Sequence, residues 1–435
     1  MKPLCIVSCP IDTFSGYGAR SRDFVKSLIE VKDKEWHIKI MPQRWGDTPW
    51  NFLPQDDPLR QRFIGNLPQQ PDVWIQITVP NEFQRVGKFN IGVSAGIETN
   101  IYPGEFIEGS NRMDLNLVSS NHSKQVALST QFERKDQNSN QTVGIVKMEK
   151  PIEVLFEGLD LNKYYKKPAS SKINILKDIK EDFCFLHTGH WLPGAFGESR
   201  KNSATLVKTF LETFNKGGRK KPALILKTNQ VNYSLLDREN ILKHINRIRD
   251  EVSGSLPNIY LLHGEMTDEE MNQLNNDPKV KAFISFTKGE GYGRPLAEAA
   301  ITGKPVIVSN WSGHKDFIHP DYNILISGNL KNVHESAANQ FLLKESSWFN
   351  INTNIASRAM KDVFKQYKKY HEKSRKQTQY LKDNFSFDKM TEVLSSFLDQ
   401  VPTQKIVELK LPKLKKLPKL GETKNQFPKL EKIAE

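Results

Sequence analysis

Short apolar runs alternate with stretches of helical periodicity along most of this chain. In the first half, the apolar runs predict strands at residues 4–7, 37–41, 73–79, 90–94 and 115–119. The second half repeats the rhythm, with strands predicted at residues 183–187, 223–227, 259–262, 282–286 and 306–308. Parallel strands joined by helices require this alternation. The pattern therefore predicts an α/β protein with two doubly wound, Rossmann-like parallel sheets in tandem.

Helical periodicity fills the stretches between the predicted strands. Phe24, Leu28 and Val31 recur on one face of a helix predicted over residues 19–31. Further helices are predicted over residues 203–215, 235–252, 268–274, 355–383 and 387–400. The polar stretch 134–150 holds few large apolar residues and is predicted to be a loop or linker.

Composition narrows the class of protein. A chain of 435 residues is too long for one core and predicts at least two domains. The three cysteines show no metal-binding spacing and fit a reducing, cytoplasmic setting. No apolar run is long enough to span a membrane, and the first residues lack the apolar region of an export signal. The formal net charge of +13 suits a polyanionic partner such as nucleic acid, an anionic membrane or a phosphorylated donor.

The segment "KGEGYGRPLAEAAITGKPVIVSNWSGHKDF", residues 288–317, carries the candidate chemistry. It predicts a glycine-rich turn at the carboxyl end of a buried strand, followed by a helix over 295–301 with proline in its first turn. Open α/β sheets bind ligands at this edge, and a helix N-terminus there suits a diphosphate. Glycines 289, 291 and 293 are expected to let the backbone approach a ligand, with Glu290 and Glu298 flanking it. The alternative is a tight strand–helix connection with two solvated glutamates.

Several other site classes are excluded by spacing. Pro305 follows Lys304 where a P-loop needs Ser or Thr, and the dinucleotide fingerprint around Gly16 and Gly18 is incomplete. The chain has no His-Glu-x-x-His and no Asp-x-Asp. A metal–nucleotide clamp of the Asp-x-Asp type is therefore not expected, and no metal site is predicted.

The segment "EGYGRPLAEAAITGKPVIVSNWSGHKD" resembles the E-x7-E signature of the retaining nucleotide-sugar glycosyltransferases of family 4, which have the GT-B fold. The resemblance extends from about residue 3 to 398. "FLHTGHWLPGAFGESRKN" is similar to the phosphate-binding segment of that family, and "NIYLLHGEMTDEEM" to the segment bordering the nucleotide base. "SGYG" resembles the glycine-rich loop that faces the cleft, and the overall pattern also resembles enzymes of tailed bacteriophages.

This resemblance implies a metal-independent transfer of a sugar from a nucleotide diphosphate sugar, such as a UDP- or GDP-sugar, with retention and with no cofactor. It implies that Glu290 holds hydroxyls of the transferred sugar, that Arg200 and Lys201 neutralise the leaving diphosphate, and that Glu298 holds the ribose. The implied donor-binding residues are Gly291, Tyr292, Gly293, Arg294, Pro295, Leu296, Glu298, Gly264, Glu265, Met266, Gly16 and Gly18. Glu98 and Thr99 in "GIETN" are the candidates on the acceptor side.

The same resemblance divides the chain into four parts. Residues 1–165 are expected to form the acceptor-side domain and 166–383 the donor domain. Residues 384–400 are expected to be a helix that returns to the first domain, and 401–435 a basic tail. Two departures affect the identity of the donor: Arg294 replaces an apolar residue, and "HWLPGAFGES" lengthens the phosphate loop.

The acceptor is left open by these motifs. A modified DNA base, lipopolysaccharide, a protein or a small glycoside all fit, and a phage-encoded enzyme would act in the host cytoplasm. Two other classes are a non-catalytic nucleotide-sugar-binding module and a DNA-binding protein whose tail dominates. The four residues Glu290, Glu298, Arg200 and Lys201 argue against the first. The tail, with nine lysines against four glutamates, lacks the interleaved aromatic residues expected of the second.

Overall fold

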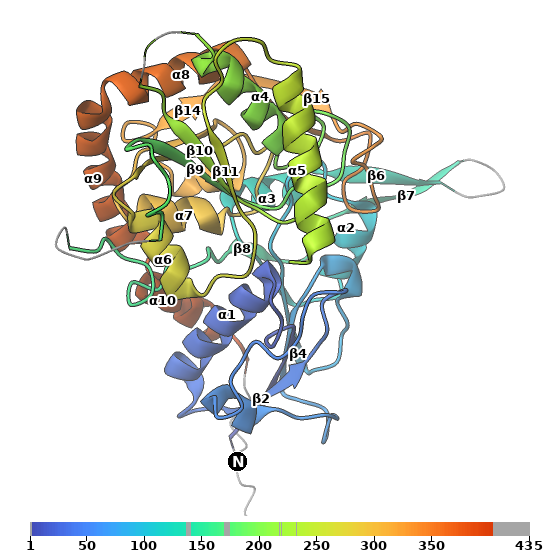
Figure 1. Cartoon of the computed structure of the whole chain (residues 1–435). Helices are drawn as coiled ribbons and strands as arrows, with labels where there is room; N and C mark the ends of the chain where they lie inside the picture. Colours follow the sequence, from blue (N-terminus) through green and yellow to red (C-terminus); the bar gives the residue numbers. More distant parts are fainter. Residues whose placement is uncertain are drawn as a thin grey trace, which may run out of the picture. The chain divides into compact units, whose positions relative to one another are not determined.

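A computed structural model describes residues 2–135, 141–168, 175–216, 218, 220–231 and 233–402. The predicted basic tail lies outside the described residues from position 403 onward. Within the described part, the strands and helices form two lobes, each built on one parallel sheet (Figure 1). We call them the N-terminal lobe and the C-terminal lobe.

The sheet of the N-terminal lobe has the strand order β2-β1-β3-β4-β5-β8, and all its pairings are parallel. Its strands are β1 (Leu4–Cys9), β2 (His37–Pro42), β3 (Val73–Ile77), β4 (Phe89–Val93), β5 (Leu115–Val118) and β8 (Ile152–Val154). Its helices are α1 (Gly16–Lys32), α2 (Gly104–Ser110) and α3 (Asn121–Ser129), with 3-10 turns at Pro58–Arg62 and Pro80–Glu82. β1 is buried on both faces, as the uninterrupted run LCIVSC requires.

The sheet of the C-terminal lobe has the order β11-β10-β9-β12-β13-β14, again all parallel. Its strands are β9 (Cys184–Thr188), β10 (Ala223–Lys227), β11 (Ile259–Leu262), β12 (Val280–Ser285), β13 (Val306–Ser309) and β14 (Ile324–Ile326). Its helices are α4 (Ser203–Phe214), α5 (Leu235–Asp250), α6 (Asp268–Asn276), α7 (Arg294–Ala300), α8 (Thr353–Lys365) and α9 (Tyr367–Asn384). The prediction of two doubly wound parallel sheets is confirmed.

The last helix, α10 (Phe387–Leu398), packs beside α1 in the N-terminal lobe (Figure 1). Met390, Leu394 and Leu398 enter the apolar core of that lobe. Lys32 Nζ at the end of α1 binds Asp399 Oδ1 at 2.7 Å. The chain therefore returns to its first sheet after it completes the second.

The prediction of a loop over 134–150 is wrong for residues 134–135 and 142–147, and its residues 136–140 lie outside the described part of the chain. Strands β6 (Gln131–Lys135) and β7 (Thr142–Lys147) form an antiparallel hairpin. Only Phe132 and Val146 turn toward a core cluster, while Val143 and Ile145 are exposed. A hairpin satisfies its backbone hydrogen bonds locally, so it needs fewer apolar residues than a central strand, and the apolar pattern missed it.

The prediction of one helix over 355–383 is also wrong, because α8 ends and α9 begins around Gln366 (φ −120°, ψ 36°). No glycine or proline marks this break in the sequence. α8 buries Ala356, Met360 and Val363 under the sheet, whereas α9 buries a different face that packs on α7. The helix is therefore interrupted because its two halves pack against different partners, and not because of a glycine or proline at the break. A second antiparallel pair, β15 (Gly328–Asn332) with β16 (Ser347–Ile351), was not predicted.

Among the described residues, no helix has both the length and the apolar character needed to cross a bilayer.

Candidate active site

The site is built on the turn that joins β12 to α7. Gly293 ends this turn with φ 109°, a left-handed conformation that favours glycine, and Pro295 follows in the first turn of α7. Ser312 Oγ accepts a hydrogen bond from the Glu290 backbone N–H at 2.9 Å, and Glu290 O accepts one from Gly313 N at 3.0 Å. These bonds fix the turn from both sides, so the Glu290 side chain has a defined direction.

The Glu290 carboxylate lies between two cations. Lys201 Nζ is 2.6 Å from Oε1, and Arg200 NH1 is 3.3 Å from Oε2. Burial alone would raise the pKa of Glu290, but the charges of Lys201 and Arg200 outweigh it and lower that pKa to about 2. The carboxylate is therefore ionised throughout the neutral range.

Arg200 also connects the two lobes. Its NH1 is 3.4 Å from Oε1 of Glu98, which belongs to the loop after β4 in the N-terminal lobe. Burial tends to lower the pKa of Arg200, and the carboxylates of Glu98 and Glu290 more than compensate, so this pKa is raised. Glu98, Arg200, Lys201 and Glu290 thus form one charged cluster contributed by both lobes.

The two cations directly precede helix α4. Asn202 stands between Lys201 and the helix in a left-handed conformation (φ 55°), and no side chain caps the first turn. The amide groups of that turn add the positive end of the helix dipole to the charges of Arg200 and Lys201. This arrangement suits a diphosphate.

Two of the glycines have a packing role that was not predicted. A Cβ at Gly289 would lie 2.0 Å from Glu98 O, and one at Gly291 would lie 2.0 Å from Ala95 O. Here the backbone approaches the main chain of the opposite lobe, not an open ligand space. These glycines allow the turn to pack against residues 95–98, and their role in donor binding stays a prediction.

Glu298 occupies the buried face of α7, one turn after Arg294. Burial raises the pKa of Glu298 to about 7; Arg294 opposes the shift, while Asp268, Asp23 and Glu157 add to it. Arg294 Nε is 3.8 Å from Glu298 Oε1. Glu298 therefore lies close to Arg294 and near the carboxylates of Asp268, Asp23 and Glu157.

The other predicted residues fall into three groups. The side chains of Tyr292 and Leu296 pack in the core, so only their backbone is free to meet a ligand. Gly264, Glu265 and Met266 follow β11, where Gly264 O accepts a hydrogen bond from Lys227 Nζ at 2.6 Å.

On the side of the N-terminal lobe, Gly16 begins α1, and a Cβ at Gly18 would lie 2.3 Å from Thr13 O. Tyr17, between them, accepts a hydrogen bond from Ala95 N on its hydroxyl at 3.0 Å. Thr99 is fully buried, and its hydroxyl donates to Ile101 O at 3.2 Å. The first turn of α1, which holds the two glycines, therefore reaches the segment carrying Glu98.

Two supporting interactions were missed from the sequence. One is the Ser312 hydroxyl that fixes Glu290. The other is Lys288, which is fully buried and binds Glu198 Oε2 at 3.1 Å in the lengthened phosphate loop. Ser312 lies inside the segment 288–317, so the sequence could have suggested it as a site residue. The sequence holds no signal that residues 198 and 288 form an ion pair.

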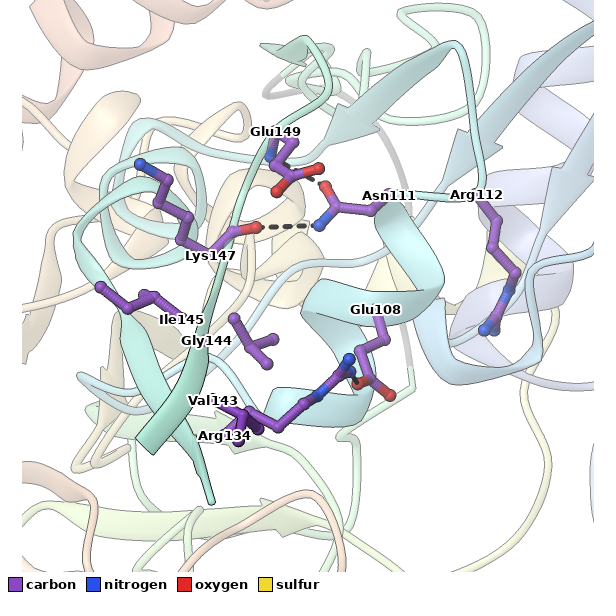
Figure 2. A pocket seen from close by; sticks show the side chains of 10 residues that line it. Glu108, Asn111, Arg112, Arg134, Val143, Gly144, Ile145, Lys147 and Glu149 are labelled. Carbon is purple, nitrogen blue, oxygen red and sulfur yellow. Dashed lines mark hydrogen bonds and ion pairs between the residues drawn. The ribbon is translucent and has the colours of Figure 1, made fainter. Parts of the chain in front are cut away.

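A cavity of about 570 Å³ lies elsewhere, between α2 and β7 (Figure 2). Asn111 bridges to Lys147 O and Glu149 N across it, and Arg134 binds Glu108. Because its central polar groups already have partners and none belongs to the Glu290 cluster, this cavity is not the candidate site. In the described part of the chain, no group of three or more His, Cys, Asp or Glu side chains is arranged to hold a metal ion.

Similarity to solved structures identifies the fold. The chain is similar to sucrose-phosphate synthase from Thermosynechococcus elongatus, with TM-score 0.59 and 10% identity over 92% of this chain and 99% of that one. It is also similar to Anabaena HepE solved with UDP-glucose (TM-score 0.59, 11% identity, 91% and 99% covered). A glycosyltransferase from Rickettsia africae gives TM-score 0.59 at 12% identity, with 92% and 98% covered.

The chain therefore has the GT-B fold, two Rossmann-like domains of nearly the full length of these structures. No protein-family model matches the sequence, and no curated protein matches it at a significant level.

Proposed function

We propose that this protein is a glycosyltransferase that moves a sugar from a nucleotide diphosphate sugar to an acceptor hydroxyl. The observation that carries this proposal is the Glu290 carboxylate held by Lys201 and Arg200 at the carboxyl end of β12, with Glu98 of the opposite lobe beside it. A carboxylate suits sugar hydroxyls, and two fixed cations with a helix N-terminus suit a diphosphate. The GT-B fold and the UDP-glucose bound to HepE support the same donor class.

The residues divide the chemistry between them. The bond from the anomeric carbon to the diphosphate breaks, and the acceptor oxygen bonds to that carbon. The departing diphosphate, as a nearby base, takes the proton of the acceptor hydroxyl. Arg200, Lys201 and the first turn of α4 stabilise the charge that develops on the leaving group, which removes the need for a metal in this proposal. Retention of configuration is proposed from the resemblance of residues 290–316 to the retaining family.

A donor screen tests the proposal. The protein is incubated with a panel of UDP- and GDP-sugars, and slow release of nucleoside diphosphate is followed by chromatography. One donor is expected to turn over, and loss of that turnover in Glu290→Gln assigns it to this site. A protein that binds UDP but releases none from any donor would instead be the non-catalytic binding module.

Glu298 is expected to make nucleotide binding depend on pH. Its proposed role, accepting hydrogen bonds from ribose hydroxyls, requires the carboxylate, and its pKa is about 7. UDP affinity should therefore rise as the pH rises through 7, and Glu298→Gln should remove this component. Calorimetry with UDP is done on the parent and on Glu298→Gln between pH 6 and 8.5. Titration of the UDP phosphate affects the two proteins equally, so the difference between their pH profiles reports Glu298. Identical pH profiles would show that Glu298 does not hold the ribose.

The same pKa has a consequence for stability. Because the pKa of Glu298 is raised on folding, the stability that its protonation contributes is present below the unfolded value of about 4.3 and is lost as the pH rises through 7. The unfolding temperature of the parent should therefore fall relative to that of Glu298→Gln as the pH rises from 5 to 8.

For the acceptor we propose a polyanion, and DNA carrying a hydroxylated base is the first to test, because the net charge is +13. Binding to duplex DNA should weaken steeply with salt, since each neutralised phosphate releases counterions. The role of the tail is tested by removing residues 403–435; Val401 is kept because it is buried in the core of the N-terminal lobe. This removes nine lysines and four glutamates, a net charge of +5.

The truncated protein should bind DNA more weakly with a flatter salt slope and unchanged donor hydrolysis. Absence of any salt-dependent DNA binding by the full chain at low ionic strength would redirect the search to lipopolysaccharide, protein or small-glycoside acceptors.

A further inference from the structure

Arg294 has a different set of partners from the other cations near the site. Its NH1 binds Asp23 Oδ2 at 2.8 Å and Glu157 Oε2 at 3.2 Å. Asp23 lies on α1 in the N-terminal lobe, and Glu157 lies in the segment that follows β8 and leads toward the second sheet. The guanidinium of the first residue of α7 therefore points toward the other lobe and not toward the cations that would hold the diphosphate.

This contact is largely enclosed, with 23% of the Arg294 side chain and 12% of the Asp23 side chain exposed. Arg20, Phe24, Leu155 and Met390 close around Arg294, and the space between them has no room for a water molecule. Asp23 and Glu157 are nearly buried, and Arg20 alone adds a second, longer contact of 3.9 Å to Glu157. Without Arg294, the buried carboxylates of Asp23 and Glu157, both on the side of the N-terminal lobe, would lose the cation that they share. Such an arrangement is costly, because removal of one partner leaves the other charge desolvated and unpaired.

We propose that Arg294 is a positioning residue that ties α7 to the opposite lobe and thereby keeps Glu98 opposite Glu290. α7 begins at the end of the Glu290 turn, so its N-terminus and that turn move together. The Arg294 contacts lie at the start of α7, and the close approach of Gly289 and Gly291 to residues 95–98 lies just before it in the same turn. That approach leaves no space to absorb a shift, so loss of the tie separates the two halves of the site. This inference rests on the proposed function only for its effect on turnover.

The distance between the lobes tests the inference without any substrate. The cysteines at 5, 9 and 184 are buried, so dyes can be attached at Gln84→Cys in the N-terminal lobe and Lys243→Cys on α5, both exposed positions. Single-molecule energy transfer should show a larger and broader lobe separation in Arg294→Leu than in the parent.

Arg60→Leu is the matched control, because Arg60 binds the buried Asp12 at 3.0 Å within a single lobe. It should lower the unfolding temperature without changing the lobe separation. An unchanged separation in Arg294→Leu overturns the inference. If that variant does not fold, Asp23→Asn and Glu157→Gln must each widen the separation, and no change in either overturns it as well.

Turnover supplies the second readout. Arg294→Leu should lower kcat/KM for sugar transfer by about 30-fold, as expected for truncation of one partner of a buried charge pair. Both contacts of Arg294 come from the same nitrogen, so Arg294→Lys, with one ammonium group, should restore most of the loss and the parent separation. Failure of Lys to restore either quantity counts against the tie. Because the separation is measured without a donor, a result there stands whether or not the protein proves to be a glycosyltransferase.

Discussion

Glu290→Gln is expected to lower sugar transfer by about 10³-fold, the upper range for loss of one fixed electrostatic contact in an active site. The substitution keeps the shape of the side chain but removes the charge that faces the sugar hydroxyls. Nucleoside diphosphate binding should stay the same or become tighter, because the carboxylate no longer neutralises Lys201 and Arg200. Steady-state transfer rates and calorimetry with UDP measure the two effects separately.

Glu251→Gln provides the control for this substitution. Glu251 is an exposed carboxylate in the same lobe, and it binds Lys208 at 3.1 Å. Transfer by that variant should equal that of the parent. If Glu290→Gln retained transfer within a few-fold, or lost UDP binding together with transfer, its assignment to the sugar would be wrong.

Arg200→Ala and Lys201→Ala are each expected to slow donor turnover by about 10²-fold or more, because each removes a fixed positive charge from the leaving diphosphate. The two residues share Glu290 as a partner, so the double variant should lose less than the product of the single losses. Lys208→Ala, seven residues after Lys201 on α4, is the control and should turn over donor at the parent rate.

Excess EDTA should leave the parent rate unchanged, since the proposed stabilisation comes from side chains and helix amides. Loss of activity on chelation that Mg²⁺ or Mn²⁺ restores would contradict the proposal. Normal turnover in both Arg200→Ala and Lys201→Ala would do so independently.

Local sequence was sufficient for the elements that carry the site. A buried strand, a glycine-rich turn and a helix opened by proline were predicted over residues 282–301, and the structure has β12, the turn and α7 there. The left-handed conformation of Gly293 (φ 109°) could be predicted from the sequence, because it depends on the residues next to it in the turn. The break at Gln366 and the β6–β7 hairpin were not predictable in this way, since packing partners distant in sequence determine both.

The sequence by itself determined the two parallel sheets and the placing of Glu290 at a strand end and of Glu298 within the following helix. Only the tertiary structure decided which charges meet. Lys201 reaches Glu290 because β9 and β12 are neighbours in the sheet, and Arg294 binds Asp23, 271 residues away, because the fold brings the first residue of α7 to α1. Gly289 and Gly291 face the main chain of the other lobe for the same reason. Apolar periodicity records how each segment is buried, whereas ion pairs and close backbone approaches depend on how separate segments pack, which no single stretch of sequence contains.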